Sequence, residues 1–180
     1  MNDAIPIPLP LILGGWHEFY ILLGTASATM VALLFVAASI AGGVFSHGRR
    51  APLRVFLSAS VVHFSSVLAA SLIILVPLQS RVALAVLIAA CGLFGLTYSC
   101  LAWRDTARDQ LNAAIDLEDR IWYILLPVGV YVLEIAAGIA STWHTRDACT
   151  ALAMVTGMLL VIGIHNAWDI TVWMITQRRE

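Results

Sequence analysis

Four ionisable side chains lie inside long apolar runs of this chain: His63, Glu134, His165 and Asp169. A charged group costs several kcal/mol at the centre of a membrane, so such residues usually face a bundle interior, a water-filled cavity or a partner. At ~1.5 Å of helical rise per residue, they lie ~10 to ~21 Å from one common end of their helices. Titratable groups at adjacent depths can relay protons or admit cations. We therefore expect the four side chains to converge on one hydrated chamber.

Helical spacing groups these residues with polar neighbours. His165 and Asp169 are four residues apart, so they share a helix face and can pair directly, with Asn166 beside them. Pro127 has no N–H to donate to the carbonyl of Tyr123, which leaves that oxygen free for another partner. Two further stripes are predicted, one of Pro127, Tyr131, Glu134 and Gly138 and one of Ser60, His63 and Ser71.

Each of these groups also has a purely structural interpretation. His63 could hydrogen-bond one helix to another, and a protonated Glu134 could do the same across a helix interface. His165 and Asp169 could satisfy each other. The membrane penalises each group separately, so a shared functional cavity and independent structural roles stay open as alternatives.

The elements that must position these residues are membrane-spanning helices. Hydrophobic residues make up 61% of the chain and charged residues 12%, about half the charge of a soluble domain. A span needs ~20 apolar residues, and five runs qualify: 16–40, 55–76, 82–103, 121–141 and 149–176. The prediction is an all-α bundle of five transmembrane helices in a single domain, residues 1–180. Residues 5–10 should lie extended before the first span, and residues 104–120 should form a short amphipathic cytoplasmic helix.

Arginine distribution predicts the orientation of the bundle. All ten cationic residues are arginines, and eight of them lie in residues 49–54, residues 104–120 and the C-terminal tail. Because arginine-rich loops stay cytoplasmic, the N-terminus is expected outside and the C-terminus inside. We expect a multi-pass protein of a bacterial inner membrane. A formal net charge of −1 gives no indication of nucleic-acid binding.

The first functional hypothesis is a cation- or proton-permeable channel or carrier without a cofactor. A protomer this small would enclose a pore most readily as a homo-oligomer. The first span is expected to be central, because its small residues permit close helix approach. Its hydroxyls would either face the pore or bond back to their own helix. The residues predicted to line the path are His63, Glu134, His165, Asn166, Asp169, Tyr131, Thr25, Thr29 and Glu18.

Two other classes of function remain. His63 and His165 lie at similar depth on different helices, as the two axial ligands of a haem b would, and with Asp169 and Glu134 they could instead hold a transition metal. The chain has no His-Glu-x-x-His signature to strengthen that interpretation. In the third class, a non-catalytic accessory membrane subunit, the polar groups would only specify helix pairing.

Several short motifs resemble a known group of proteins. Residues 18–29, EFYILLGTASAT, and the following LLFVA resemble the opening of small, uncharacterised bacterial multi-spanning membrane proteins. Val62-His63-Phe64 and Asn166-Ala167-Trp168-Asp169 also resemble patterns of that group. The resemblance implies a multi-pass architecture and carries no activity with it.

Overall fold

The protein is entirely helical throughout the residues described by the computed structural model, which are 7–44, 50–108 and 120–177. The elements, in chain order, are α1 (Leu9–Gly14), α2 (His17–Val44), α3 (Arg50–Leu75), α4 (Arg81–Arg108), the π-helical turn η3 (Ile121–Leu125), α6 (Leu126–Ala140) and α7 (Thr145–Gln177). The expected all-α bundle is confirmed. The amphipathic helix predicted for residues 104–120 lies largely outside the described residues, although α4 extends to Arg108.

Four stretches of helix are long and apolar enough to cross a membrane: His17–Ile40, Arg81–Arg104, Ile121–Ala140 and Thr145–Asp169. The apolar part of α3, Ala59–Leu75, is shorter. Large apolar side chains point outward along these helices, including Leu22 at 70% and Met154 at 71% exposure. The interior, by contrast, buries serines, a histidine and a glutamate. The interior also holds a large apolar core, so it is the extensive exposed apolar surface that suits a bundle surrounded by lipid.

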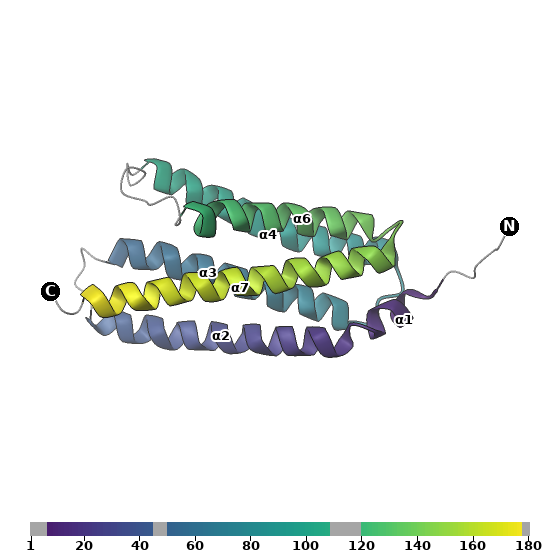
Figure 1. Cartoon of the computed structure of the whole chain (residues 1–180), viewed down its shortest axis with the longest axis horizontal. Coiled ribbons are helices and arrows are strands. Elements are labelled where there is room, and N and C mark those ends of the chain that lie inside the picture. Colours follow the sequence, from purple (N-terminus) through teal and green to yellow (C-terminus); the bar gives the residue numbers. More distant parts are fainter. Residues whose placement is uncertain (1–6, 45–49, 109–119, 178–180) are drawn as a thin grey trace.

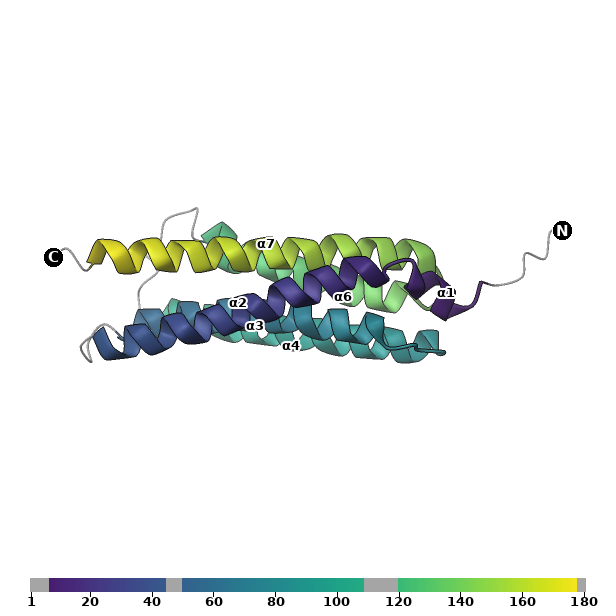
Figure 2. The same ribbon diagram turned by 90° about the horizontal axis from the view of Figure 1, so that it is seen from below.

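Four helices form a closed ring. α3 packs on α4, α4 on α6, α6 on α7, and α7 on α3 (Figures 1 and 2). α2 lies outside this ring, mainly against α3 and with fewer contacts to α7. The turns from α3 to α4 and from α6 to α7 lie at the same end as α1, and the C-terminus lies at the opposite end (Figure 1).

The expected central position of the first span is therefore wrong. Its small residues do allow close approach, but to one neighbour only: a Cβ on Gly24 would lie 3.1 Å from the Cβ of Ser71 on α3. The Ser27 hydroxyl donates a hydrogen bond to the carbonyl of Phe64 on the same neighbour. Ala28 and Ala32, which follow Gly24 at successive i+4 positions on the same helix face, are exposed. Small residues indicate tight packing but not the number of helices that pack.

Two further segments differ from a simple run of spans. The extended segment predicted for residues 5–10 ends early, because Leu9 and Pro10 already belong to α1, where Pro10 occupies the first turn and needs no donor. In the predicted fourth span, the helix widens to a π turn just before Pro127, and the Leu126 N–H bonds to the Ile121 carbonyl. The proline ring would clash with the carbonyl four residues earlier, that of Tyr123, and a wider turn relieves that conflict.

Candidate functional site in the bundle interior

Tyr131 joins two helices that do not otherwise pack closely. Its side chain leaves α6, passes over α4 and reaches α3, where its hydroxyl lies 2.9 Å from Nδ1 of His63 and 3.3 Å from Oγ of Ser66. Tyr131 is fully buried, and His63 is 1% exposed. The phenol has one proton, so when it donates to Ser66 it accepts from a protonated Nδ1, and when it donates to Nδ1 it accepts from Ser66. The three groups can therefore exchange the direction of their hydrogen bonds.

Glycine on α4 gives the Tyr131 ring its room. A Cβ on Gly95 would lie only 2.1 Å from Cε1 of Tyr131, far inside contact distance. Gly138, one turn beyond Glu134 on α6, allows a similar close approach, because a Cβ there would lie 3.2 Å from the backbone nitrogen of Ala89. These glycines let α4 and α6 pack tightly enough for a tyrosine from one side of the ring to contact the opposite helix.

Glu134 lies one turn from Tyr131 on α6 and is completely buried. Neither of its carboxyl oxygens has an aligned hydrogen-bond donor among the described residues. The Cys91 thiol of α4 lies beside it, but a thiol is a weak donor, and its sulfur is 3.6 Å from the carbonyl of Ser66. An ionised carboxylate in such surroundings is strongly disfavoured, so this group can gain and lose a proton only when a partner or water reaches it. We call His63, Ser66, Cys91, Tyr131 and Glu134 the interior cluster.

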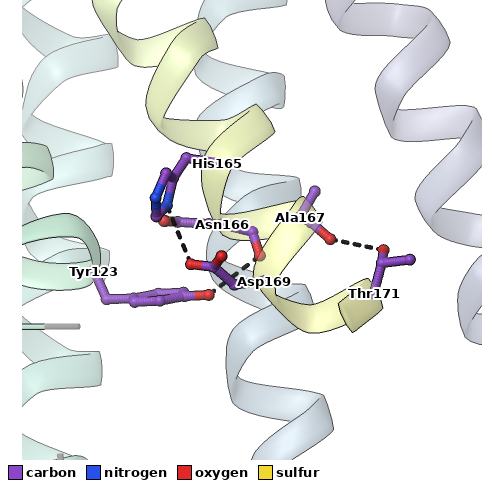
Figure 3. A network of polar contacts seen from close by, with 6 residues as sticks. All are labelled: Tyr123, His165, Asn166, Ala167, Asp169 and Thr171. Atoms are coloured by element: carbon purple, nitrogen blue, oxygen red, sulfur yellow. Dashed lines mark hydrogen bonds and ion pairs between the residues drawn. The ribbon is translucent and has the colours of Figure 1, made fainter. Parts of the chain in front are cut away.

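A second set of polar residues lies around the C-terminal half of α7 (Figure 3). Nδ1 of His165 is 3.1 Å from a carboxylate oxygen of Asp169, which confirms the predicted pair. The Trp122 ring of η3 stacks on His165 with centroids 3.8 Å apart and an angle of 5°. The Tyr123 hydroxyl donates a hydrogen bond to the backbone carbonyl of Asn166 at 3.1 Å. We call these five residues, Trp122, Tyr123, His165, Asn166 and Asp169, the α7 cluster.

The α7 cluster combines accessible and buried groups. The side chains of His165 and Asp169 are 29% and 37% exposed. Asn166 is fully buried, and neither polar atom of its amide has a hydrogen-bond partner among the described residues. Along η3 and α6, Tyr123 and Tyr131 are separated by ~12 Å of helical rise. The α7 cluster therefore lies between the interior cluster and the end of the bundle that carries the C-terminus (Figure 1).

The predicted path residues thus divide into two clusters instead of one chamber. His63, Tyr131 and Glu134 belong to the interior cluster, and His165, Asn166 and Asp169 to the α7 cluster. The remaining three predicted residues, Glu18, Thr25 and Thr29, lie exposed on α2. The Thr29 hydroxyl donates to the backbone carbonyl of Thr25 at 2.8 Å. Of the two possibilities for the hydroxyls of this helix, this is the one in which they bond back to their own helix. The three residues are separated from both clusters because α2 lies outside the four-helix ring.

The metal hypotheses gain no geometric support. Within residues 7–44, 50–108 and 120–177, no three of the His, Cys, Asp and Glu side chains lie together as ligands of one ion. His63 contacts Tyr131, whereas His165 contacts Trp122 and Asp169. Comparison of the chain with protein-family models, curated proteins and solved structures found no match.

Sequence reasoning missed several members of these clusters. Ser66 is three residues from His63 and could have been found from helical spacing. Cys91 could not, because a single thiol in an apolar run is ordinarily a small hydrophobic residue. Trp122 was missed as well, because its stacking on His165 joins η3 to α7, and the sequence of one helix does not determine which neighbour it packs against.

Proposed function

We propose that this chain crosses a bacterial inner membrane five times and conducts protons through the bundle interior as a channel or carrier. The observation that carries the proposal is the interior cluster: a buried, reversible hydrogen-bonded chain of His63, Tyr131 and Ser66, one turn from a buried carboxyl group. Each of these polar groups is costly to bury in a membrane, so their presence inside apolar helices favours a functional role.

The fifth span in this proposal is α3. It is the common neighbour of α2, α4 and α7, which supports a position in the same membrane layer that those helices cross. Its full length, Arg50–Leu75, corresponds to ~39 Å of helix, more than the ~30 Å of hydrocarbon in a bilayer. Near α1, the first turns of α4 and α7 carry Arg81 and Arg146, whereas the described helix ends at the opposite end carry five arginines: Arg50, Arg54, Arg104, Arg108 and Arg120. That bias supports an outside N-terminus and a cytoplasmic C-terminus.

The chemistry of the interior cluster favours protons over larger cations. A dehydrated metal cation needs several oxygen ligands around it, and the interior cluster offers one carboxyl group with a phenol, a hydroxyl and an imidazole. Those same groups can donate and accept protons. The partly exposed His165–Asp169 pair would collect protons on the cytoplasmic side and pass them toward Tyr131. A homo-oligomer, as expected from the size of the chain, belongs to the same proposal.

Purified protein in liposomes tests the function. An internal pH dye follows acidification driven by a potassium diffusion potential, first with sodium and then with choline as the external cation. Proton flux that is independent of sodium supports the proposal, and sodium-dependent flux would redirect it to cation transport.

The competing functions have distinct outcomes in the same preparation. No flux under either polarity of gradient would overturn conduction. A Soret absorbance band in the purified protein would then point to haem b on His63 and His165. No band, together with co-purification of a larger membrane protein, would point to an accessory subunit.

A further inference from the structure

Two buried side chains on neighbouring helices have polar atoms without a partner. Asn166 of α7 is fully buried, and neither its amide nitrogen nor its amide oxygen has a hydrogen-bond partner among the described residues. His63 of α3 is 1% exposed, and its Nδ1 contacts Tyr131, but its Nε2 has no partner in the same part of the chain. Buried amide and imidazole groups normally have partners, because an unpaired one costs free energy. These atoms therefore call for a common explanation.

A close contact between Phe64 and Gly163 fixes how α3 and α7 face each other. The two helices pack together and run in opposite directions (Figure 1). A Cβ on Gly163 would lie 2.7 Å from Cε1 of Phe64, so the phenyl ring lies directly against the α7 backbone. From this contact, His63 is ~1.5 Å along α3 and Asn166 is ~4.5 Å along α7. Because the helices are antiparallel, both steps lead toward the end of the bundle that carries the C-terminus.

Contacts on either side of Asn166 show where its side chain points. Successive residues of an α-helix are ~100° apart around the axis. Gly163 faces Phe64 on α3, and His165 faces Trp122 on η3. Asn166 falls between these two directions, ~60° from Gly163 and ~100° from His165. Its side chain is therefore directed into the bundle interior between α3 and η3, which agrees with its complete burial.

The same geometry directs His63 into this space from α3. Phe64 faces α7, and Ser66 contacts Tyr131 of α6. His63 falls between these directions, ~100° from Phe64 and ~60° from Ser66. Side chains of a helix lean toward its N-terminus. In this antiparallel pair, His63 therefore leans toward the level of Asn166, and Asn166 leans back toward the level of His63.

We infer that one water molecule binds between Nε2 of His63 and the side-chain amide of Asn166, in the space between α3, α7 and η3. A bound water needs two to four polar partners. The amide supplies a donor and an acceptor, and Nε2 accepts or donates according to which ring nitrogen carries the proton. The water can therefore bond to both residues whichever way the Tyr131 hydrogen bond runs. It joins the two clusters, and its further role in passing protons from the α7 cluster to Tyr131 rests on the proposed function.

A structure of the purified protein that resolves ordered water tests the site. The expected result is density for an oxygen within hydrogen-bond distance of both Nε2 of His63 and the Asn166 amide. This density should be lost in Asn166→Leu, which nearly keeps the side-chain size and removes the polar atoms. Thr156→Val is the matched control and should keep the density, because the buried Thr156 hydroxyl bonds back to the Leu152 carbonyl at 2.7 Å.

Three results would overturn the inference. The first is a dry wild-type site, and the second is a direct bond between His63 and Asn166 that leaves no place for water. The third is density that persists in Asn166→Leu.

Thermal stability gives an independent test. If the water joins the two residues, Asn166→Leu leaves Nε2 of His63 without its bridge and should lower Tm by about 2–4 °C. In a His63→Phe background, the same change should no longer lower Tm, because the two residues are coupled. If the amide is buried dry and unpaired, Asn166→Leu should raise Tm in the wild-type background. That result, or an equal loss in both backgrounds, contradicts the inference.

Neither readout depends on transport, so a protein that binds this water and conducts nothing overturns the proposed function alone. In liposomes that conduct, Asn166→Leu should reduce proton flux severalfold, whereas Thr156→Val should leave it unchanged. Equal flux in the two variants would overturn the role of the water in the proton path.

Discussion

The Nδ1 atom of His63 lies 2.9 Å from the hydroxyl of Tyr131, and this contact links α3 to α6 across the four-helix ring. Hydrogen bonds between membrane helices contribute about 0.6 kcal/mol on average, so the contact adds little to the stability of the bundle. It places an imidazole in contact with a phenol that has a second hydroxyl, Ser66, within reach. Under the proposed function, what matters is that the hydrogen bonds of Tyr131 to His63 and Ser66 can reverse direction.

Tyr131→Phe should separate these two roles. The ring still fills the space over Gly95, but His63 and Ser66 both lose a partner. We expect a loss of about 1–2 kcal/mol in unfolding free energy, measured by chemical denaturation in detergent, because two hydrogen bonds disappear from a buried site. Proton flux should fall at least tenfold. Full flux in a variant that folds would show that protons do not pass through Tyr131.

Gly95→Ala tests the packing that positions Tyr131. The added methyl group would overlap the tyrosine ring, so the ring must move and its bonds to His63 and Ser66 must break. We expect destabilisation of about 1–3 kcal/mol from overpacking and a flux as low as that of Tyr131→Phe. Gly129→Ala is the control, because a Cβ at Gly129 meets nothing within 4 Å. Unchanged flux in Gly95→Ala would contradict the proposed position of the ring.

Asp169→Asn addresses the α7 cluster. The His165–Asp169 pair is partly exposed, and exposed ion pairs contribute about 0–1 kcal/mol, so stability should hardly change. Flux should decrease, because the carboxylate that would collect protons at the cytoplasmic side is gone. Asp147→Asn is the control, since this exposed carboxylate lies in the first turn of the same helix. Similar flux in both variants would exclude Asp169 from the path.

The membrane topology can be tested by cysteine labelling. In a background without native cysteines, single cysteines replace Gln79, His144, Ser46 or Gln110. A membrane-impermeant maleimide should label the first two in intact spheroplasts and the last two only after permeabilisation. This pattern requires α3 to cross the bilayer. Labelling of Gln79 and Ser46 from the same side would reduce the bundle to four spans.

Local periodicity predicted much of the interior from the sequence. Pro127, Tyr131, Glu134 and Gly138 were expected on one line of the fourth span, and all four are buried. The His165–Asp169 pair was also predicted, because both residues lie on one helix. The interior cluster could not be predicted fully, since Tyr131 reaches His63 only through the space left by Gly95 on a third helix. The position of α2 was missed for a similar reason: the sequence of one helix does not determine how many neighbours surround it.

The most direct test of proton passage is the rate of acidification of liposomes containing Glu134→Gln. The amide has nearly the size and polarity of the carboxyl group but cannot ionise to release a proton, so we expect flux to fall to the level of protein-free liposomes. Glu134→Asp keeps a carboxyl group and should retain part of the flux. Glu18→Gln is the control and should retain all of it, because Glu18 lies exposed on α2. Wild-type flux in a correctly folded Glu134→Gln protein would contradict the account.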